Sequence, residues 1–239
     1  MIENPRILVP IDVSDPDEPA LDLIGALRPL RIVLLGYYPV PDQTPPQQIR
    51  EAYEQDAKDA LEASARRFAD AGTDLESVLV FTRDRVQTAD RVANEYDCDA
   101  VLVTGEVTTL SRVLVSLKNE QNMFRVLDVI RLIMEGNDLE VTLFHADSVE
   151  QGSARSELYL RGATDWLVEQ GLSRESIFWK EPTAETQRSD LLDLAASHDF
   201  VVMGEHEPGI RERVIGDLPN SVHDTTGRAV LVVRKERGG

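Results

Sequence analysis

The fold is decided by two short apolar runs, RILVPI at Arg6–Ile11 and RVLVSL at Arg112–Leu117. Both begin with arginine, are rich in β-branched residues and lead into an amphipathic segment, which is typical of a buried strand followed by a helix. A second pair behaves alike, because DAVLVTG at 99–105 matches DFVVMG at 199–204. A period of roughly a hundred residues indicates two similar units in one chain.

Strand-like and helix-like segments alternate along the whole chain. In the helix-like segment at 47–72, one stripe is formed by Ile49, Tyr53, Ala57, Leu61, Ala65 and Phe68. In the segment at 122–136, the residues expected to point inward are Phe124, Leu127, Ile130 and Met134. Such alternation predicts parallel sheets with right-handed crossovers and helices on both faces.

We therefore expect two tandem, open, Rossmann-like α/β/α domains, at 1–108 and 109–239. The first is expected to be truncated to four strands and the second to have five. An alternative makes RVLVSL the closing strand of the first unit. We prefer it as the opening strand of the second, because it feeds a helix as a first strand does.

Charge and composition exclude several functional classes. The net charge is −18, from 43 acidic and 25 basic residues, which disfavours a nucleic-acid partner. Only four lysines accompany the acids, which indicates the cytosol of a salt-loving microbe, and we expect a halophilic archaeon. The single cysteine, Cys98, fits a reducing compartment, and no apolar run reaches membrane-spanning length. A cytoplasmic protein without membrane insertion is expected.

Three stretches carry a resemblance to a known family. They are RILVPIDVS at 6–14, VVMG at 201–204 and IGDLPNSVHDTTGRAVLVV at 215–233. In order and spacing the chain resembles the universal stress protein family, in its tandem form. The resemblance implies the adenine nucleotide alpha-hydrolase-like fold. In nucleotide-binding members, an Asp-containing turn after strand one receives adenine. A loop of pattern Gly-x-x-Gly, nine residues, then Gly-Ser or Gly-Thr holds ribose and phosphates.

The second unit departs from this loop pattern, in GEHEPGIRERVIGDLPNS at 204–221. Gly204 matches the first glycine, whereas Glu207 holds the place of the second. Gly209 lies within the loop, the spacing to Gly216 is one residue short, and Asp217 replaces the hydroxyl residue. Asp217 is a good N-cap, so its carboxylate is expected to occupy the amides that would bind phosphate. Lys118 also replaces the adenine-side Asp.

The first unit has the opposite defect. Its turn is intact, with Pro10, Asp12 and Ser14. Only Glu106–Ser111 separates Gly105 from the next unit, which leaves no room for a loop, a helix and a fifth strand. The degenerate candidate nucleotide site therefore comprises Asp12, Ser14, Gly105, Gly204, Gly209, Gly216 and Asp217.

Other constellations predict no chemistry. The acids Asp12, Asp15, Asp17 and Glu18 are expected to cap a helix and face solvent, and His206 with His223 lacks a third zinc ligand. No catalytic residue and no metal site are predicted, and we expect no enzyme and no bound cofactor.

We expect a non-catalytic stress-protein-like module that acts in stress response or regulation through protein contacts, in a homodimer or with another protein. AVLVVRK at 229–235 is the predicted dimer contact. The alternative is an adenine-nucleotide-binding (ATP or AMP) stress protein, with Arg211 or Arg213 supplying a variant loop.

Overall fold

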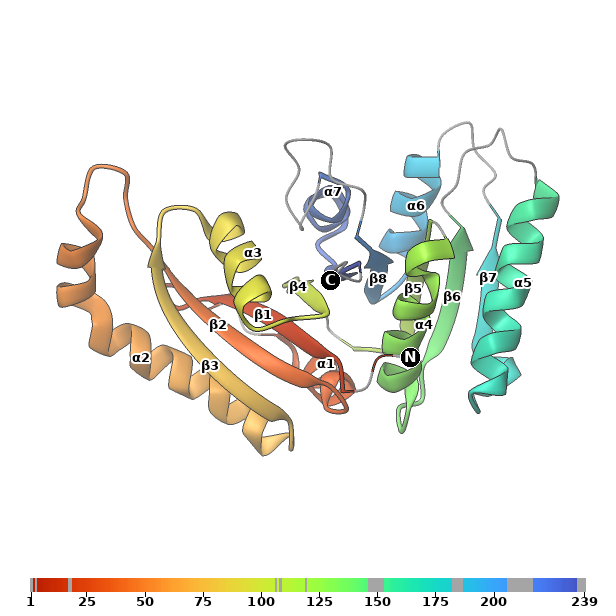
Figure 1. Ribbon diagram of the computed structural model, residues 1–239, viewed down its shortest axis with the longest axis horizontal. Coiled ribbons are helices and arrows are strands. Elements are labelled where there is room, and N and C mark those ends of the chain that lie inside the picture. Colours follow the sequence, from red (N-terminus) through yellow and green to blue (C-terminus); the bar gives the residue numbers. More distant parts are fainter. Residues whose placement is uncertain are drawn as a thin grey trace.

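One continuous nine-stranded sheet runs through the molecule in the computed structural model, in the order β3-β2-β1-β4-β9-β8-β5-β6-β7 (Figure 1). The structure describes all residues except 1, 3, 17–18, 106, 108, 119, 146–152, 182–186, 206–216 and 236–239. The first half consists of β1 (Arg6–Asp12), α1 (Leu21–Leu27), β2 (Arg31–Pro39), α2 (Pro46–Asp70), β3 (Asp74–Thr82), α3 (Arg85–Glu95) and β4 (Ala100–Val103). The second half consists of β5 (Arg112–Leu117), α4 (Glu120–Met134), β6 (Glu140–His145), α5 (Ser153–Glu169), the 3-10 turn η2 (Arg174–Ser176), β7 (Ile177–Lys180), α6 (Gln187–Ala196), β8 (Phe200–Gly204), α7 (Asp217–Thr226) and β9 (Ala229–Val233).

The predicted α/β fold class is confirmed, with four strands in the first half and five in the second. RVLVSL is strand β5, which pairs with β6 and β8 of the second half, so the alternative that it closes the first half is wrong. The division into domains at 1–108 and 109–239 stays a prediction, because the strands of both halves share one sheet.

The two halves meet at an antiparallel strand pair, β4 with β9. Val103 lies opposite Val230 and Val101 opposite Val232, while the other edge of β9 pairs in parallel with β8. Strand β4, which would otherwise be an apolar edge of the four-stranded first half, is therefore covered by the second half of the same chain. The predicted dimer contact through 229–235 is wrong for β9, because a strand with two paired edges has no free hydrogen-bonding groups for another chain.

Helices cover both faces of this sheet. On one face α1, α2, α4 and α5 pack on a single core that extends across the join, from Ile7 and Phe68 to Leu231 and Val233. On the opposite face α3 covers the first half, and α6 with α7 covers the second. Because the side chains of a strand alternate between the two faces of a sheet, the residues of β1 and of β9 point alternately into the core on one face and the core on the other.

The same contact is made twice in the two halves. The backbone amide of Asp99 donates to the Arg6 carbonyl oxygen at 2.7 Å, and its carboxylate accepts from the Arg6 amide at 3.0 Å. Asp199 makes the equivalent pair with Arg112, at 2.9 and 2.8 Å. Each half thus uses an aspartate before its fourth strand to fix the start of its first.

A buried arginine after β9 locks the halves together. The Arg234 guanidinium donates to the carbonyl oxygens of Ala93 and Cys98, each at 3.1 Å, and to Asn94 Oδ1 at 2.7 Å. Arg125 of α4 donates to the Arg234 carbonyl oxygen at 2.9 Å. Through these bonds the second half supplies hydrogen-bond donors to carbonyl oxygens at the carboxyl end of α3. The two halves are therefore connected by more than a strand pair.

Most predicted elements lie where periodicity placed them, but two details differ. Phe124 of α4 is 50% exposed rather than inward. Its ring packs edge-to-face on that of Trp166 in α5, with 6.0 Å between the two ring centres. Tyr53 of the α2 stripe is also largely exposed, and stacks on Tyr38 at 5.3 Å.

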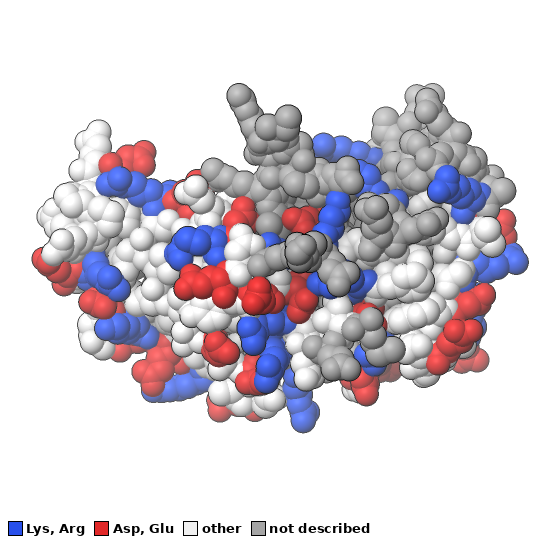
Figure 2. Space-filling model, in the orientation of Figure 1, with Lys and Arg blue, Asp and Glu red and all other residues white. Residues whose placement is uncertain are grey.

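Charged side chains of both signs are interspersed on the visible surface, among the residues that are described (Figure 2). Within the described ranges, no helix is both long and apolar enough to cross a membrane.

Candidate functional site

Two positions in this sheet suit a ligand, one in each half. Strand order reverses beside β1 in the first half and beside β5 in the second, and both strands then neighbour their half's fourth strand, β4 or β8. In open parallel sheets the crevice outside the carboxyl ends of the strands at such a reversal is the usual ligand position. The predicted site residues Asp12 and Gly105 border the first position, and Gly204 borders the second.

At the first position the predicted turn is formed, and its aspartate is hydrogen-bonded within the turn. Asp12 Oδ1 accepts the Ser14 backbone amide at 2.9 Å and the Ser14 hydroxyl at 2.6 Å. The structure therefore brings these two predicted residues together, with the carboxylate engaged by its own turn. Next to this turn, the pKa of the Tyr38 phenol is raised, mainly by burial and then by Tyr53 and Asp12. The phenol is therefore neutral.

Gly105 is covered by the backbone that leads into β9. A Cβ atom at Gly105 would lie 2.6 Å from three backbone atoms, the nitrogen of Ala229, the carbonyl carbon of Arg228 and the oxygen of Gly227. Glycine is required here because two backbones approach closely. The place where a phosphate loop would leave the first half is thus occupied by the second half.

An open groove of about 300 Å³ remains at the first position, between α3 and α7, which lie on the same side of the sheet (Figure 1). Its lining comprises Pro10, Tyr37, Arg85, Val86, Ala89, Leu102, Val103, Thr104, Asn220, His223 and Asp224. The strands and α3 supply an apolar floor, while polar groups come from both helices. Asn220, His223 and Asp224 belong to the second half, so the groove is a composite of both halves.

One histidine of this groove has a fixed orientation. His223 Nδ1 lies 3.2 Å from the Arg228 carbonyl oxygen, which can only accept, so Nδ1 carries the donated proton. In the neutral ring Nε2 is then the acceptor.

Among the described residues, little space remains at the second position. The cavity lined by Lys118, Asn122, Gly204 and Glu205 holds about 10 Å³, room for about one water molecule. The Asn122 side chain occupies it, donating to the Val233 carbonyl oxygen at 3.0 Å, and a Cβ at Gly204 would lie 2.8 Å from its Nδ2 atom. Glu205 accepts the Lys235 amide at 2.9 Å.

Two of the predicted residues lie outside the described ranges, Gly209 and Gly216. Asp217 was predicted to cap the start of a helix, and it is the first residue of α7. The capping hydrogen bond itself remains a prediction. Within the described residues, no group of three or more His, Cys, Asp or Glu could hold a metal ion. His206, Asp17 and Glu18 also lie outside them.

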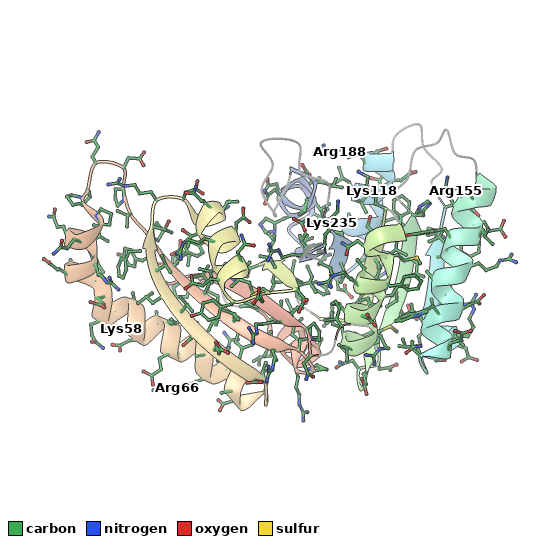
Figure 3. All side chains as sticks on the ribbon, viewed as in Figure 1. Lys58, Arg66, Lys118, Arg155, Arg188 and Lys235 are labelled. Atoms are coloured by element: carbon green, nitrogen blue, oxygen red, sulfur yellow. The ribbon has the colours of Figure 1, made fainter. Side chains whose placement is uncertain are left out.

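Four basic side chains lie on one side of the second half, and of these the sequence analysis singled out only Lys118. Figure 3 shows Lys118, Arg155, Arg188 and Lys235 on the side of the second half toward which β5 and β8 run, well apart from Lys58 and Arg66 on α2. Lys118 follows β5 and Lys235 follows β9, whereas Arg155 and Arg188 lie in the first turns of α5 and α6. The signal was present in the sequence, since the carboxyl ends of parallel strands meet at one edge.

Sequence comparison gives no match, either to a protein-family profile or to a curated protein. Structure comparison does. The chain is similar to a universal stress protein from Archaeoglobus fulgidus DSM 4304, with a TM-score of 0.72 at 14% identity, over 98% of this chain and 100% of that one. The chain has the fold of the universal stress proteins. It is also similar to a putative universal stress protein from Pseudomonas aeruginosa UCBPP-PA14, with a TM-score of 0.53 at 18% identity, over 96% of this chain and 93% of that one. At such identities the likeness is one of fold.

Proposed function

We propose that this chain is a non-catalytic stress-protein-type module that binds no ATP and acts in stress response or regulation through protein contacts. The fold supports the class, and the contacts that the protein makes with itself at both ligand positions support the loss of nucleotide binding. We also propose that the protein is cytoplasmic and salt-adapted and that it uses no cofactor. It then works as a homodimer or with another protein. Because β9 has no free edge, that partner contacts a surface other than β9.

The observation that carries the proposal is that the protein's own atoms restrict both strand-order reversals, leaving an open groove of about 300 Å³ at the first and a cavity of about 10 Å³ at the second. At the first, the backbone of Gly227–Ala229 lies against Gly105, where ribose and phosphates would need glycine backbone. At the second, Asn122 leaves about 10 Å³ beside Gly204, whereas small-molecule pockets have roughly 300 Å³ or more. A phosphate loop therefore has no room beside Gly105, and the groove that remains at the first position, about 300 Å³, lies at the lower end of ligand-pocket volumes. Binding at the second position would require Asn122 to move.

Mass spectrometry of small molecules released from the natively purified chain tests this proposal. We expect no adenine nucleotide in stoichiometric amount. A melting series with ATP and Mg²⁺, at low and at high salt, is the companion measurement. A ligand at 100 times its Kd would add about 2.7 kcal/mol of stability, so an unchanged melting temperature supports the proposal. A co-purified nucleotide, or a clear upward shift at both salt concentrations, contradicts it.

A second candidate function, binding of an anionic adenine nucleotide through a variant loop, is favoured by the basic side chains of Figure 3. Lys118 and Arg188 lie near the second position, in a chain whose net charge would otherwise repel phosphate. If this function holds, ATP binding is weakened by Lys118→Gln and by Arg188→Gln. The matched control Lys58→Gln, on α2, leaves it unchanged. Equal affinity in all four proteins would exclude the candidate.

A further inference from the structure

We propose that the groove between α3 and α7 is a binding site for a small zwitterion, an α-amino acid with an apolar side chain. The first step is its shape. A cavity of about 300 Å³ lies at the lower end of ligand-pocket volumes, which suits a molecule of about a dozen non-hydrogen atoms. Apolar side chains of Pro10, Ala89 and Val103 line its floor, with Val86 alongside, whereas the Leu102 side chain lies in the core on the opposite face of the sheet.

The second step is the charge of the two walls. Arg85 lines the groove from α3 and Asp224 lines it from α7. Both are exposed, and neither makes a hydrogen bond or an ion pair with another residue in the described part of the chain. The groove thus holds one available cation and one available anion on opposite helices.

The helix dipoles have the same signs as these side chains. Arg85 is the first residue of α3, whose N-terminal end carries partial positive charge. Asp224 lies in the last turn of α7, whose C-terminal end carries partial negative charge. Each residue therefore sits at the end of its helix where its charge is unfavourable to the helix. Residues that break such local rules tend to mark functional sites.

These signs select the class of ligand. A simple anion would gain at Arg85 but would be repelled by Asp224 and by the net charge of −18. A zwitterion is neutral overall and satisfies both walls, with its carboxylate toward α3 and its ammonium toward α7. Thr104 and Asn220 offer further hydrogen bonds, and the apolar floor receives the side chain.

The test compares three probes that share one ring: L-phenylalanine, 3-phenylpropionate, which lacks the ammonium, and 2-phenylethylamine, which lacks the carboxylate. Binding to the full chain is measured by calorimetry and by the amide shifts of Ala89, Thr104 and Asn220. We expect L-phenylalanine to bind about tenfold or more tightly than either analogue, since each loses hydrogen bonds to a charged group.

Two variants assign the charges. In Arg85→Gln the advantage of L-phenylalanine over 2-phenylethylamine disappears, and in Asp224→Asn its advantage over 3-phenylpropionate disappears. The controls Arg83→Gln and Asp193→Asn, exposed charges outside the groove, leave both ratios unchanged. Because Arg85 and Asp224 oppose their helix dipoles, their variants should melt no lower than the parent chain, which excludes unfolding as the cause. The proposal is overturned if 3-phenylpropionate binds as tightly as L-phenylalanine, or if no probe moves these amides.

Discussion

Gly105 was predicted as part of a degenerate nucleotide site with no room for a phosphate loop, and in the structure it lets two backbone segments approach closely. The strand segment that leads into β9 lies 2.6 Å from where its Cβ would be, and that contact involves backbone, which has little freedom to move. At this residue the backbone of the second half therefore packs directly after the fourth strand of the first half.

Gly105→Ala is expected to lower the free energy of unfolding by about 1–3 kcal/mol, because the added methyl group forces β9 away from β4. Urea unfolding measures the change. The control is Gly162→Ala in α5, where nothing lies within 4 Å of the new Cβ, so a gain of about 0.5–1 kcal/mol is expected. Equal stability of the Gly105 variant and the parent would show that the contact is not tight.

His198 provides a pH dependence at the same scale. Burial in the first place lowers its pKa, and its Nδ1 donates to the Leu194 carbonyl oxygen at 2.7 Å while Nε2 accepts from the Thr142 hydroxyl at 2.9 Å. The folded protein therefore holds the neutral ring, whereas the unfolded chain protonates below about pH 6.5. Stability should fall as the pH drops below that value, until the folded ring protonates as well.

The neighbouring Asp199 acts in the same direction at lower pH. Partial burial alone would raise its pKa, but hydrogen bonds from Arg112 and Ser111 together lower it, so its contribution is lost as the pH falls through the acid range. Unfolding free energies of the parent and of His198→Gln from pH 5 to 8 separate the two residues. The variant should show a smaller slope between pH 5 and 6.5. An unchanged slope would mean that His198 does not titrate differently on folding.

At the scale of elements, β9 is the centre of the molecule rather than its edge. Val230 and Val232 are fully buried, opposite Val103 and Val101 of β4. Val232→Lys is expected to unfold the protein rather than to separate subunits, since an unpaired buried charge costs several kcal/mol. Circular dichroism and sedimentation distinguish these results. Ser77→Lys on the exposed edge strand β3 is the control and should stay folded. A natively folded Val232→Lys monomer would restore β9 as a subunit contact.

The elements themselves could be predicted because their signals are local. β-branched runs gave the strands, and the stripe with Ala57, Leu61 and Phe68 gave α2, with Gly72 in the left-handed region just past its end. What covers β4 could not be predicted, because pairing between β4 and β9 joins residues more than a hundred positions apart and leaves no periodic trace. For the same reason the contact of α7 with β4 of the first half, and the position of Asn122 at the second reversal, were missed.

At the scale of the whole molecule, the halves share one sheet and one continuous core on the face covered by α1, α2, α4 and α5. The hydrogen bonds of Arg234 to the end of α3 join them further. Fusion through β4 and β9 replaces a fifth strand in the first half and places α7 across its ligand position. A composite groove lined by residues of both halves remains there. Our central proposal is that this union, together with Asn122, leaves neither position able to bind a nucleotide.

Isothermal titration calorimetry of the intact chain with ATP and Mg²⁺, and separately with AMP, tests that claim most directly. The titrations are run in high salt, where the repulsion expected from a net charge of −18 is screened. The account predicts no saturable heat for either nucleotide at millimolar concentration. Saturable binding of ATP or AMP with micromolar affinity would contradict it.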